Sequence, residues 1–380
     1  MSSTFGNKLK ISVFGQSHSE EIGVVIDGFP AGFAIDFKKL DEFMAMRAPG
    51  QNAFQTSRRE SDRVTFVSGV VNGITCGAPI CAIIANTDAR PGDYPEKLDT
   101  PRPSHADLTN NIKYNGFEDV RGGGHSSGRL TAPLCVAGAL CLQLLSQNGI
   151  EAHAHIASIH GISDTSVGLT ELPLIRSART PSDFEKVSPA DSEKYSFDDS
   201  FPVIDKTAGA RMIDEILDAK SHGDSVGGTI EVAFTGLMQG IGSPMFDGLE
   251  NRISAAVFAV PAVKGIEFGN GFEAASLFGS QNNDAFAYSE SGAIITKTNR
   301  HGGILGGISS GMPLVFKVAV KPTPSIAQTQ ETVSLRNKCN TTLETGGRHD
   351  PCIVPRALPG VVSAAAVAIT DACLCDGIFS

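Results

Sequence analysis

A short glycine-rich pattern occurs twice in this chain, and this repetition constrains the fold more than any other feature of the sequence. Residues 73–80 read GITCGAPI and residues 307–314 read GISSGMPL, an offset of 234 residues (from 73 to 307). Residues 24–32 and 229–240 also share the order strand, glycine, turn, glycine, with an offset of 208 (from 28 to 236). Two matches in the same order indicate a duplicated unit, although glycine-rich hairpins could also acquire similar sequences independently.

A duplicated unit of strands and helices is expected to pack its two copies against each other. The two sheets and two sets of central helices then form one α+β sandwich rather than two separate bodies. We therefore predict a single domain over residues 1–380, internally pseudo-duplicated, with a cofactor across its pseudo-symmetric seam.

Local patterns predict the main strands and helices. Apolar segments bounded by glycine and proline favour strands at 10–14, 23–27, 64–71 and 78–85. Apolar periodicity and capping residues favour helices that start after Asp36, at 133–148 and at 208–220. The polar stretch 177–206 is expected to cover the surface.

The overall charge disfavours two classes of partner. The chain has 31 Lys and Arg against 41 Asp and Glu, a net charge of −10, so it is expected to bind neither nucleic acid nor a membrane surface. Its most apolar stretches, 133–145 and 361–369, are shorter than the roughly 18–20 residues of a bilayer span and are interpreted as core helices. The N-terminus lacks the apolar run of a secretory signal, which predicts a cytoplasmic protein.

The eight cysteines are expected to be reduced and buried. They lie mostly in apolar segments and include no Cys-x-x-Cys pair. This arrangement disfavours disulfides and predicts no bound metal.

Two histidines lie in polar segments. A hydrophobic core does not need the polar residues of these segments. Residues 14–19 place His18 on a glycine turn after a strand, and residues 102–107 place His105 in a proline-stiffened loop. Either histidine alone is more often a solvent-exposed or core residue. Together they suit proton transfer, because imidazole titrates near neutral pH.

Two further segments combine glycine with charged groups. Residues 119–129 hold three consecutive glycines, two serines and two arginines, a combination that favours an anion site over a flexible loop with solvated arginines. The segment matches neither the Walker nor the Rossmann glycine pattern. Residues 346–352 place Arg348, His349 and Asp350 on one turn, where Asp350 could be a helix cap or a proton acceptor.

Seven motifs stand in the order found in chorismate synthases, and the chain resembles that family over nearly its whole length. They are GQSH at 15–18, RAPGQ at 47–51, RPSHAD at 102–107, RGGGHSSGR at 121–129, HGGILGGISSG at 301–311, KPTPS at 321–325 and GRHDPC at 347–352. The resemblance implies a lyase that converts a small molecule, 5-enolpyruvylshikimate 3-phosphate, to chorismate and phosphate, using reduced FMN without net redox change. It also implies antiparallel sheets around central helices, a homotetramer and a source of reductant for the flavin.

The resemblance also implies roles for individual residues. His18 resembles the acid near the departing phosphate, His105 the histidine that protonates or holds the reduced flavin, and Asp350 the carboxylate that takes the flavin N5 proton. The expected FMN-binding residues are His125, Ser126, Ser127, Ala262, Gly302, Lys321, Pro322, Thr323, Pro324, Ser325 and Arg348. The expected substrate-binding residues are Arg47, Arg121 and Arg129.

Several positions depart from the family pattern and keep other functions open. Family arginines are replaced by Met46, Ala48, Ala53 and His125, an alanine by Gly128 and a glutamate by Leu130. Each lost cation removes a charge-assisted contact of roughly 1.5–3 kcal/mol. One alternative is a divergent paralogue that binds FMN or a phosphorylated metabolite without turnover. Another is a flavin reductase that oxidises NADPH, although the chain lacks a Rossmann fingerprint.

Overall fold

Two antiparallel five-stranded sheets form the frame of the molecule. A computed structural model describes residues 3–50, 52, 54, 60–87, 98–165, 201–290, 292–346 and 349–379. The first sheet has the order β1 (Thr4–Phe5), β2 (Lys10–Phe14), β3 (Glu21–Asp27), β7 (Ile80–Ala85) and β4 (Thr65–Ser68). The second has the order β11 (Val263–Phe268), β16 (Leu314–Val320), β10 (Gly228–Thr235), β8 (Glu151–Ile159) and β9 (Ile162–Ser163).

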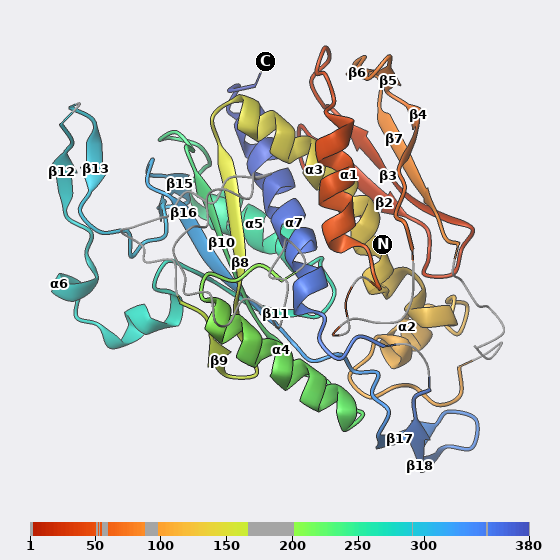
Figure 1. The fold of residues 1–380 in the computed structure, drawn as a ribbon. Coiled ribbons are helices and arrows are strands. Elements are labelled where there is room, and N and C mark those ends of the chain that lie inside the picture. Colours follow the sequence, from red (N-terminus) through yellow and green to blue (C-terminus); the bar gives the residue numbers. More distant parts are fainter. Residues whose placement is uncertain are drawn as a thin grey trace.

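Four helices lie between these sheets (Figure 1). They are α1 (Phe37–Arg47), α3 (Thr131–Gln147), α5 (Leu249–Val257) and α7 (Val354–Cys375). Helix α3 contacts β3 and β7 of the first sheet, α7 contacts β8 and β10 of the second, and the two helices pack along each other. The fold is thus a mixture of helices and antiparallel sheets, with its longest apolar helices at the centre.

Sequence patterns explain how these elements begin and which side they bury. In β7, Ile80, Ala82 and Ile84 are buried while the residues between them are more exposed, because successive side chains of a strand point to opposite faces. Helix α1 begins after Asp36, whose side chain accepts a hydrogen bond from the backbone N–H of Lys39 at 3.1 Å. The predicted start of this helix is therefore confirmed.

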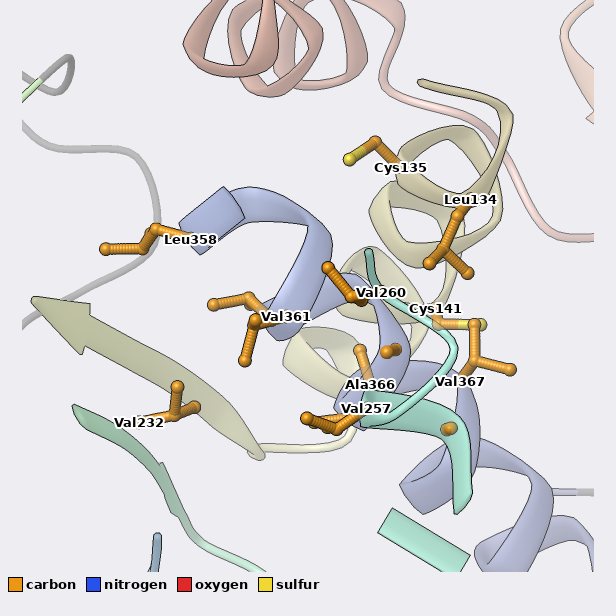
Figure 2. Close-up of a cluster of buried hydrophobic side chains, with 14 of the residues drawn as sticks. Leu134, Cys135, Cys141, Val232, Val257, Val260, Leu358, Val361, Ala366 and Val367 are labelled. Atoms are coloured by element: carbon orange, nitrogen blue, oxygen red, sulfur yellow. The ribbon is translucent and has the colours of Figure 1, made fainter. Parts of the chain in front are cut away.

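The hydrophobic core is built around α3 and α7, and Figure 2 shows part of it. Cys135 of α3 and Val361 of α7 are fully buried there, and Val232 of β10 faces the same cluster. The two helices approach closely because Gly138 has no side chain. A Cβ at this position would lie 2.2 Å from the Cβ of Ser363.

The helix predicted at 133–148 is observed as α3, whereas α7 extends well beyond the apolar stretch 361–369. Residues 128–147 and 354–375 have the length and apolar composition of a bilayer span, so the expectation that these apolar stretches are shorter than a span is wrong. However, 78% and 94% of their most apolar windows are buried inside the protein. The interpretation of both segments as core helices is confirmed by that burial.

All eight cysteines are free thiols, but only half of them are buried. Burial raises the pKa to about 12 for four of them, Cys135, Cys141, Cys352 and Cys373. Cys76 and Cys339 are exposed, and Cys81 and Cys375 are half-buried. The expectation of buried thiols is therefore wrong for these last four.

Short hairpins and helices complete the described part of the fold. The hairpins pair β5 (Val70–Val71) with β6 (Ile74–Thr75), β12 (Phe286–Tyr288) with β13 (Ile294–Thr296), β14 (Ile304–Leu305) with β15 (Ile308–Ser309), and β17 (Thr329–Ser334) with β18 (Cys339–Glu344). The remaining α-helices are α2 (Asp107–Lys113), α4 (Lys206–Ser221), which contacts β8 and β9, and α6 (Gly279–Asn282). Residues 177–200 of the expected surface stretch lie outside the described residues.

The strand predicted at 64–71 is divided into β4 and β5. Gly69, between them, has a φ of +80°. A Cβ there would lie 2.5 Å from the Cα of Ile80, so only glycine fits this close approach.

The two glycine-rich segments make corresponding hydrogen bonds in their own halves. The backbone N–H of Gly32 donates to the carbonyl of Thr75 at 2.8 Å, and that of Gly240 donates to the carbonyl of Ser309 at 3.0 Å. The side-chain hydroxyl of each acceptor residue, Thr75 or Ser309, also donates to a backbone carbonyl at 2.6 Å. These positions are separated by the offsets of 208 and 234 residues that the sequence pattern has.

The strand registers follow the same offsets. Val24 of β3 pairs with Ala82 of β7, and Val232 of β10 pairs with Phe316 of β16. The central strands β2-β3-β7-β4 of the first sheet therefore correspond in order and pairing to β8-β10-β16-β11 of the second.

Candidate active site

Loops from both halves of the chain meet around a cavity of about 1210 Å³. Its wall includes residues at the C-terminal ends of α1 and α5 and at the N-terminal ends of α3 and α7. The volume exceeds the roughly 300–1,000 Å³ of a typical small-molecule pocket, so the cavity has room for two ligands. The two helix N-termini favour negatively charged groups there.

The glycine run at 122–124 packs directly against both predicted acid–base histidines. A Cβ at Gly122 would lie 2.5 Å from Cε1 of His18, and a Cβ at Gly123 would lie 3.0 Å from Cε1 of His105. Both glycines have positive φ values, 62° and 102°. The run therefore brings the two imidazole rings to neighbouring positions on one stretch of backbone.

His105 belongs to a tightly bonded loop before α2. Its Nδ1 atom lies 2.6 Å from Oδ1 of Asp107. The guanidinium of Arg102 donates to both oxygens of the same carboxylate at 2.8 Å. Burial would raise the pKa of Asp107, but the hydrogen bonds from Arg102 and His105 outweigh it and hold this pKa far below its ordinary value.

Asp350 lies at the opposite end of the sequence and on the same wall. Its Oδ2 atom is 2.5 Å from a guanidinium nitrogen of Arg356, in the first turns of α7. His349 lines the cavity beside it, and burial lowers the pKa of this histidine. The structure thus joins the third predicted catalytic residue to the cavity that holds His18 and His105.

Two of the three arginines expected to bind the substrate, Arg47 and Arg129, are buried and paired with carboxylates. Arg47 is 1% exposed and donates to Asp62 at 2.7 Å and to the backbone carbonyl of Gly128 at 3.0 Å. Arg129 pairs with Asp62 as well and lies 3.8 Å from Glu60. Burial would raise the pKa of Asp62, but the charges of Arg47 and Arg129 hold it below its ordinary value. Both arginines line the cavity with much of their charge already compensated.

Lys264 and Lys321 differ from these arginines, because neither has a carboxylate partner among the described residues. The Nζ atom of Lys321 donates to the backbone carbonyl of Ser104 at 2.6 Å. Lys264 lies at a bulge between Val263 and Gly265 of β11 and lines the same cavity wall as Lys321. Burial, and then the positive charge of Lys264, lower the pKa of Lys321. An anionic group bound here would relieve the repulsion between the two lysines.

Most of the predicted site residues lie on the cavity wall. These are His18, Arg47, His105, Ser126, Ser127, Arg129, Ala262, Lys321, Thr323, Pro324, Ser325 and Asp350. Four others, His125, Arg121, Gly302 and Pro322, are not brought to it. Arg348 lies outside the described residues.

His125 points away from the cavity and ties the glycine run to the N-terminal loops. Its Nδ1 atom is hydrogen-bonded to the carbonyl of Gly15 at 2.7 Å, and its Nε2 atom to the hydroxyl of Ser3 at 2.7 Å. Both ring nitrogens are therefore used within the protein in a single chain, and the expected contact of His125 with the cofactor stays a prediction.

Arg121 and Gly302 also have structural surroundings of their own. Arg121 forms a two-point ion pair with Asp119, with distances of 2.8 and 2.9 Å. Gly302 packs against another loop, where a Cβ would lie 2.4 Å from the backbone nitrogen of Gly269. Pro322 lies between two wall residues but is not itself on the wall. The expected contacts of these three residues with ligands are thus not supported by their positions in a single chain.

Sequence reasoning missed several charged residues of the site. Arg356 and Lys264 line the cavity, and Asp62 and Glu60 neutralise its buried arginines. One signal was available for Arg356, which is one of only two charged residues in α7. No local pattern distinguishes Lys264 from an ordinary surface lysine.

Comparisons with known proteins agree over nearly the whole chain. The family model described as chorismate synthase matches residues 9–374. A chorismate synthase from Dehalococcoides mccartyi (strain ATCC BAA-2266 / KCTC 15142 / 195) is 43% identical over 378 residues, covering 100% of this chain and 98% of the relative. One from Korarchaeum cryptofilum is 41% identical over 367 residues, covering 97% and 96%.

A solved structure is similar as well. It is described as a crystal structure of chorismate synthase, and it superposes with a TM-score of 0.69 at 25% sequence identity. The match covers 98% of this chain and 93% of the other. The similarity therefore extends over nearly the whole chain.

Proposed function

This chain belongs to the chorismate synthase family, and from that premise we propose that it converts 5-enolpyruvylshikimate 3-phosphate to chorismate and phosphate with reduced FMN. Its curated relatives carry the name of the lyase that forms chorismate in the shikimate pathway of aromatic biosynthesis. The observation that carries the finer proposal is the meeting of His18, His105 and Asp350 on one cavity wall.

The residues of the cavity fit a phosphorylated flavin beside a polyanionic substrate. The volume of about 1210 Å³ is large enough for both molecules. Lys264 and Lys321 supply positive charge that no described carboxylate neutralises, and the hydroxyl groups of Ser126 and Ser127 lie on the same wall. When bound, reduced FMN would supply an electron-rich ring whose N5 takes up the C6 hydrogen of the substrate.

The protein's own groups would hold anions and move protons. His18 would donate a proton to the departing phosphate, and His105 would donate to or hold the anionic flavin ring. Asp350 would accept a proton, and Arg356 would hold its carboxylate in place through their ion pair. The cations and the N-termini of α3 and α7 would stabilise the negative charge that develops on the leaving phosphate.

An anaerobic assay of phosphate release tests the proposed function. Purified protein with chemically reduced FMN and 5-enolpyruvylshikimate 3-phosphate is expected to release phosphate in step with chorismate. His18→Ala should lower the rate by about 100-fold or more, the usual contribution of a general acid. No release by the wild-type protein, with flavin binding intact, would reject turnover.

One observation favours an alternative to the proposed lyase activity, namely a non-catalytic paralogue. Met46 and Ala48 replace family arginines, and the retained Arg47 is already paired with Asp62. This alternative predicts tight flavin binding, no phosphate release and no recovery of activity in Met46→Arg. A flavin reductase would instead consume NADPH steadily in the presence of free FMN.

We also propose that the fold is an internally duplicated sandwich. The corresponding hydrogen bonds of Thr75 and Ser309 and the matched strand orders of the two sheets support this proposal. The cavity receives residues from both halves, as expected for a site on a pseudo-symmetric seam.

A further inference from the structure

We infer that Asp107 is a positioning residue for His105, fixing the proton on Nδ1 of the imidazole ring and directing Nε2 to the reacting groups. The inference rests on the proposed function only for the role of His105. The arrangement of the ring itself can be tested on the protein without any ligand.

Both oxygens of the Asp107 carboxylate are fully engaged. Oδ2 accepts hydrogen bonds from the backbone N–H of Arg102 at 3.1 Å and from its Nε at 2.8 Å. Oδ1 accepts from a terminal nitrogen of Arg102 at 2.8 Å and lies 2.6 Å from Nδ1 of His105. With these contacts on both oxygens, the carboxylate cannot rotate away from the ring without losing a charge-assisted hydrogen bond.

This carboxylate decides which ring nitrogen carries a proton. The bonds from Arg102 and His105 outweigh the effect of burial and lower the pKa of Asp107, and its ionised carboxylate acts only as an acceptor. Nδ1 of His105 must therefore be the donor, both in the neutral ring and in the imidazolium. Nε2 is left as the atom that gains or loses the proton.

The rest of the loop holds the ring in place. Ser104, next to His105, has a φ of +56°, and its carbonyl accepts a hydrogen bond from Nζ of Lys321 at 2.6 Å. The Cε1 and Nε2 edge of the ring lies over Gly123, where a Cβ would be 3.0 and 3.2 Å from these atoms. Since Nδ1 faces Asp107, this edge is the part of the ring next to the glycine run.

Several charged groups surround the ring. In its own loop, Asp107 is hydrogen-bonded to Nδ1, and Arg102 is bonded to the same carboxylate. His349 reaches the site from the segment before α7, and its pKa is lowered by burial first and then by the charges of Arg102 and His105. Lys321, bonded to the Ser104 carbonyl, adds positive charge from the end of β16. Of these charged groups, Asp107 is the one whose carboxylate is hydrogen-bonded directly to the ring.

The experiment is a pH titration of the ¹⁵N-histidine-labelled, ligand-free protein by NMR. The His105 resonances are assigned by their loss in His105→Gln. In the wild-type protein the neutral ring is expected to carry its proton on Nδ1. In Asp107→Asn we expect the pKa of His105 to fall and the neutral ring to shift toward the Nε2–H form. Phosphate release by this variant should fall by roughly 10- to 100-fold with the KM changed less than about twofold, the usual size of such an effect.

A second variant makes a prediction of opposite sign. Arg102→Gln leaves Asp107 without its neutralising partner, so the pKa of His105 should rise. The matched control is an exposed histidine–carboxylate pair, in which Nδ1 of His160 lies 2.5 Å from a carboxylate oxygen of Glu215. Glu215→Gln should leave the His105 titration and the phosphate release unchanged.

The outcomes separate this inference from the proposed function. An unchanged His105 tautomer and pKa in folded Asp107→Asn would overturn the positioning role, whatever the activity. If Asp107→Asn does not fold, Arg102→Gln is compared with Asp107→Glu instead. Shifts of the His105 pKa in the same direction in these two variants would overturn the positioning role of Asp107. Normal titration behaviour in a wild-type protein that releases no phosphate would reject the proposed function and leave the positioning role standing.

Discussion

The three consecutive glycines at 122–124 are needed because other groups lie against the backbone at each position. Gly122 packs on His18, Gly123 on His105, and a Cβ at Gly124 would lie 2.4 Å from the carbonyl oxygen of Asp119. All three residues have positive φ values, which L side chains rarely adopt. This packing accounts for the run without a bound anion, so its role as an anion site stays a prediction.

Replacing either histidine-facing glycine by alanine should impair catalysis. Gly122→Ala and Gly123→Ala force His18 or His105 to move and place alanine at a positive φ, at a cost of about 1–3 kcal/mol. We expect phosphate release to fall by about tenfold or more in each variant, measured under anaerobic conditions with reduced FMN.

Gly128 provides the matched control for these two substitutions. It lies at the end of the same motif, and a Cβ there would meet nothing within 4 Å. Gly128→Ala should therefore keep wild-type activity. Equal losses in all three variants would show that the loop is sensitive to any substitution and that the packing on the histidines is not the reason.

Individual residues were predictable where their motif is contiguous in the sequence. His18, His105 and Asp350 were expected to share a site, and they line the same cavity. The partner of each is harder to predict, because a pair such as Asp350 and Arg356 depends on how a loop enters a helix. Lys264 lies at a β-bulge, which has no sequence signature here.

At the scale of elements, the close crossing of α3 and α7 determines the shape of the core. Gly138 of α3 faces Ser363 of α7, whose hydroxyl donates to the carbonyl of Pro359 at 2.7 Å. The serine thereby satisfies its polar group within its own helix, at a position that is completely buried. The helices can then approach without leaving an unpaired hydroxyl between them.

Alanine at two helical glycines should have opposite effects on stability. At Gly138 a Cβ would overlap the Cα and Cβ of Ser363 at 2.4 and 2.2 Å, so Gly138→Ala should lower the free energy of unfolding by about 1–3 kcal/mol. At Gly360 the nearest atoms of Thr131 are 3.5 Å away, an ordinary contact. Gly360→Ala should be neutral or stabilising by up to about 1 kcal/mol, because alanine favours the helix.

Urea denaturation followed by far-ultraviolet circular dichroism distinguishes these two effects. The two substitutions add the same methyl group to neighbouring helices, so each is a control for the other. A Gly138→Ala variant as stable as the wild-type protein would mean that the helices can separate at little cost.

The length of α7 was underestimated for a physical reason. Pro355, Pro359 and Gly360 in its first two turns are ordinarily signals against a helix, and the continuous apolar stretch in the sequence covers only 361–369. The observed helix includes all three, since almost all of its residues are buried and packing against α3 and α5 outweighs the local propensity. Helices with a polar face, such as α1, were predicted more accurately because their caps and periodicity agree.

At the scale of the whole molecule, the repeated glycine-rich pattern indicated more about how the strands are arranged than any local secondary-structure propensity. The offsets of 208 and 234 residues recur in the pairing of Val24 with Ala82 and of Val232 with Phe316. The difference between the two offsets means that the second half has a longer connection between its paired strands. Part of that extra chain forms a feature that the sequence analysis did not predict.

This feature is an apolar arm, defined here as residues 271–290 and 292–296. It carries α6 and the hairpin β12–β13 and projects away from the sheets (Figure 1). Phe272, Phe278, Phe286 and Tyr288 are between 69% and 85% exposed on it. Aromatic side chains gathered at such exposure on one extension are typical of a surface that is covered in an assembly.

The expected homotetramer gives the arm a partner in another copy of the chain. Light scattering after gel filtration should give four times the chain mass of 39.8 kDa for the wild-type protein. Phe278→Asp combined with Phe286→Asp should lower that mass, because burying two carboxylates in an interface is costly. Val71→Asp, at a side chain that is 59% exposed on another hairpin, is the control and should keep the wild-type mass. A double variant that remains tetrameric would exclude the arm from the interface, and a monomeric wild-type protein would show that the tetramer prediction is wrong.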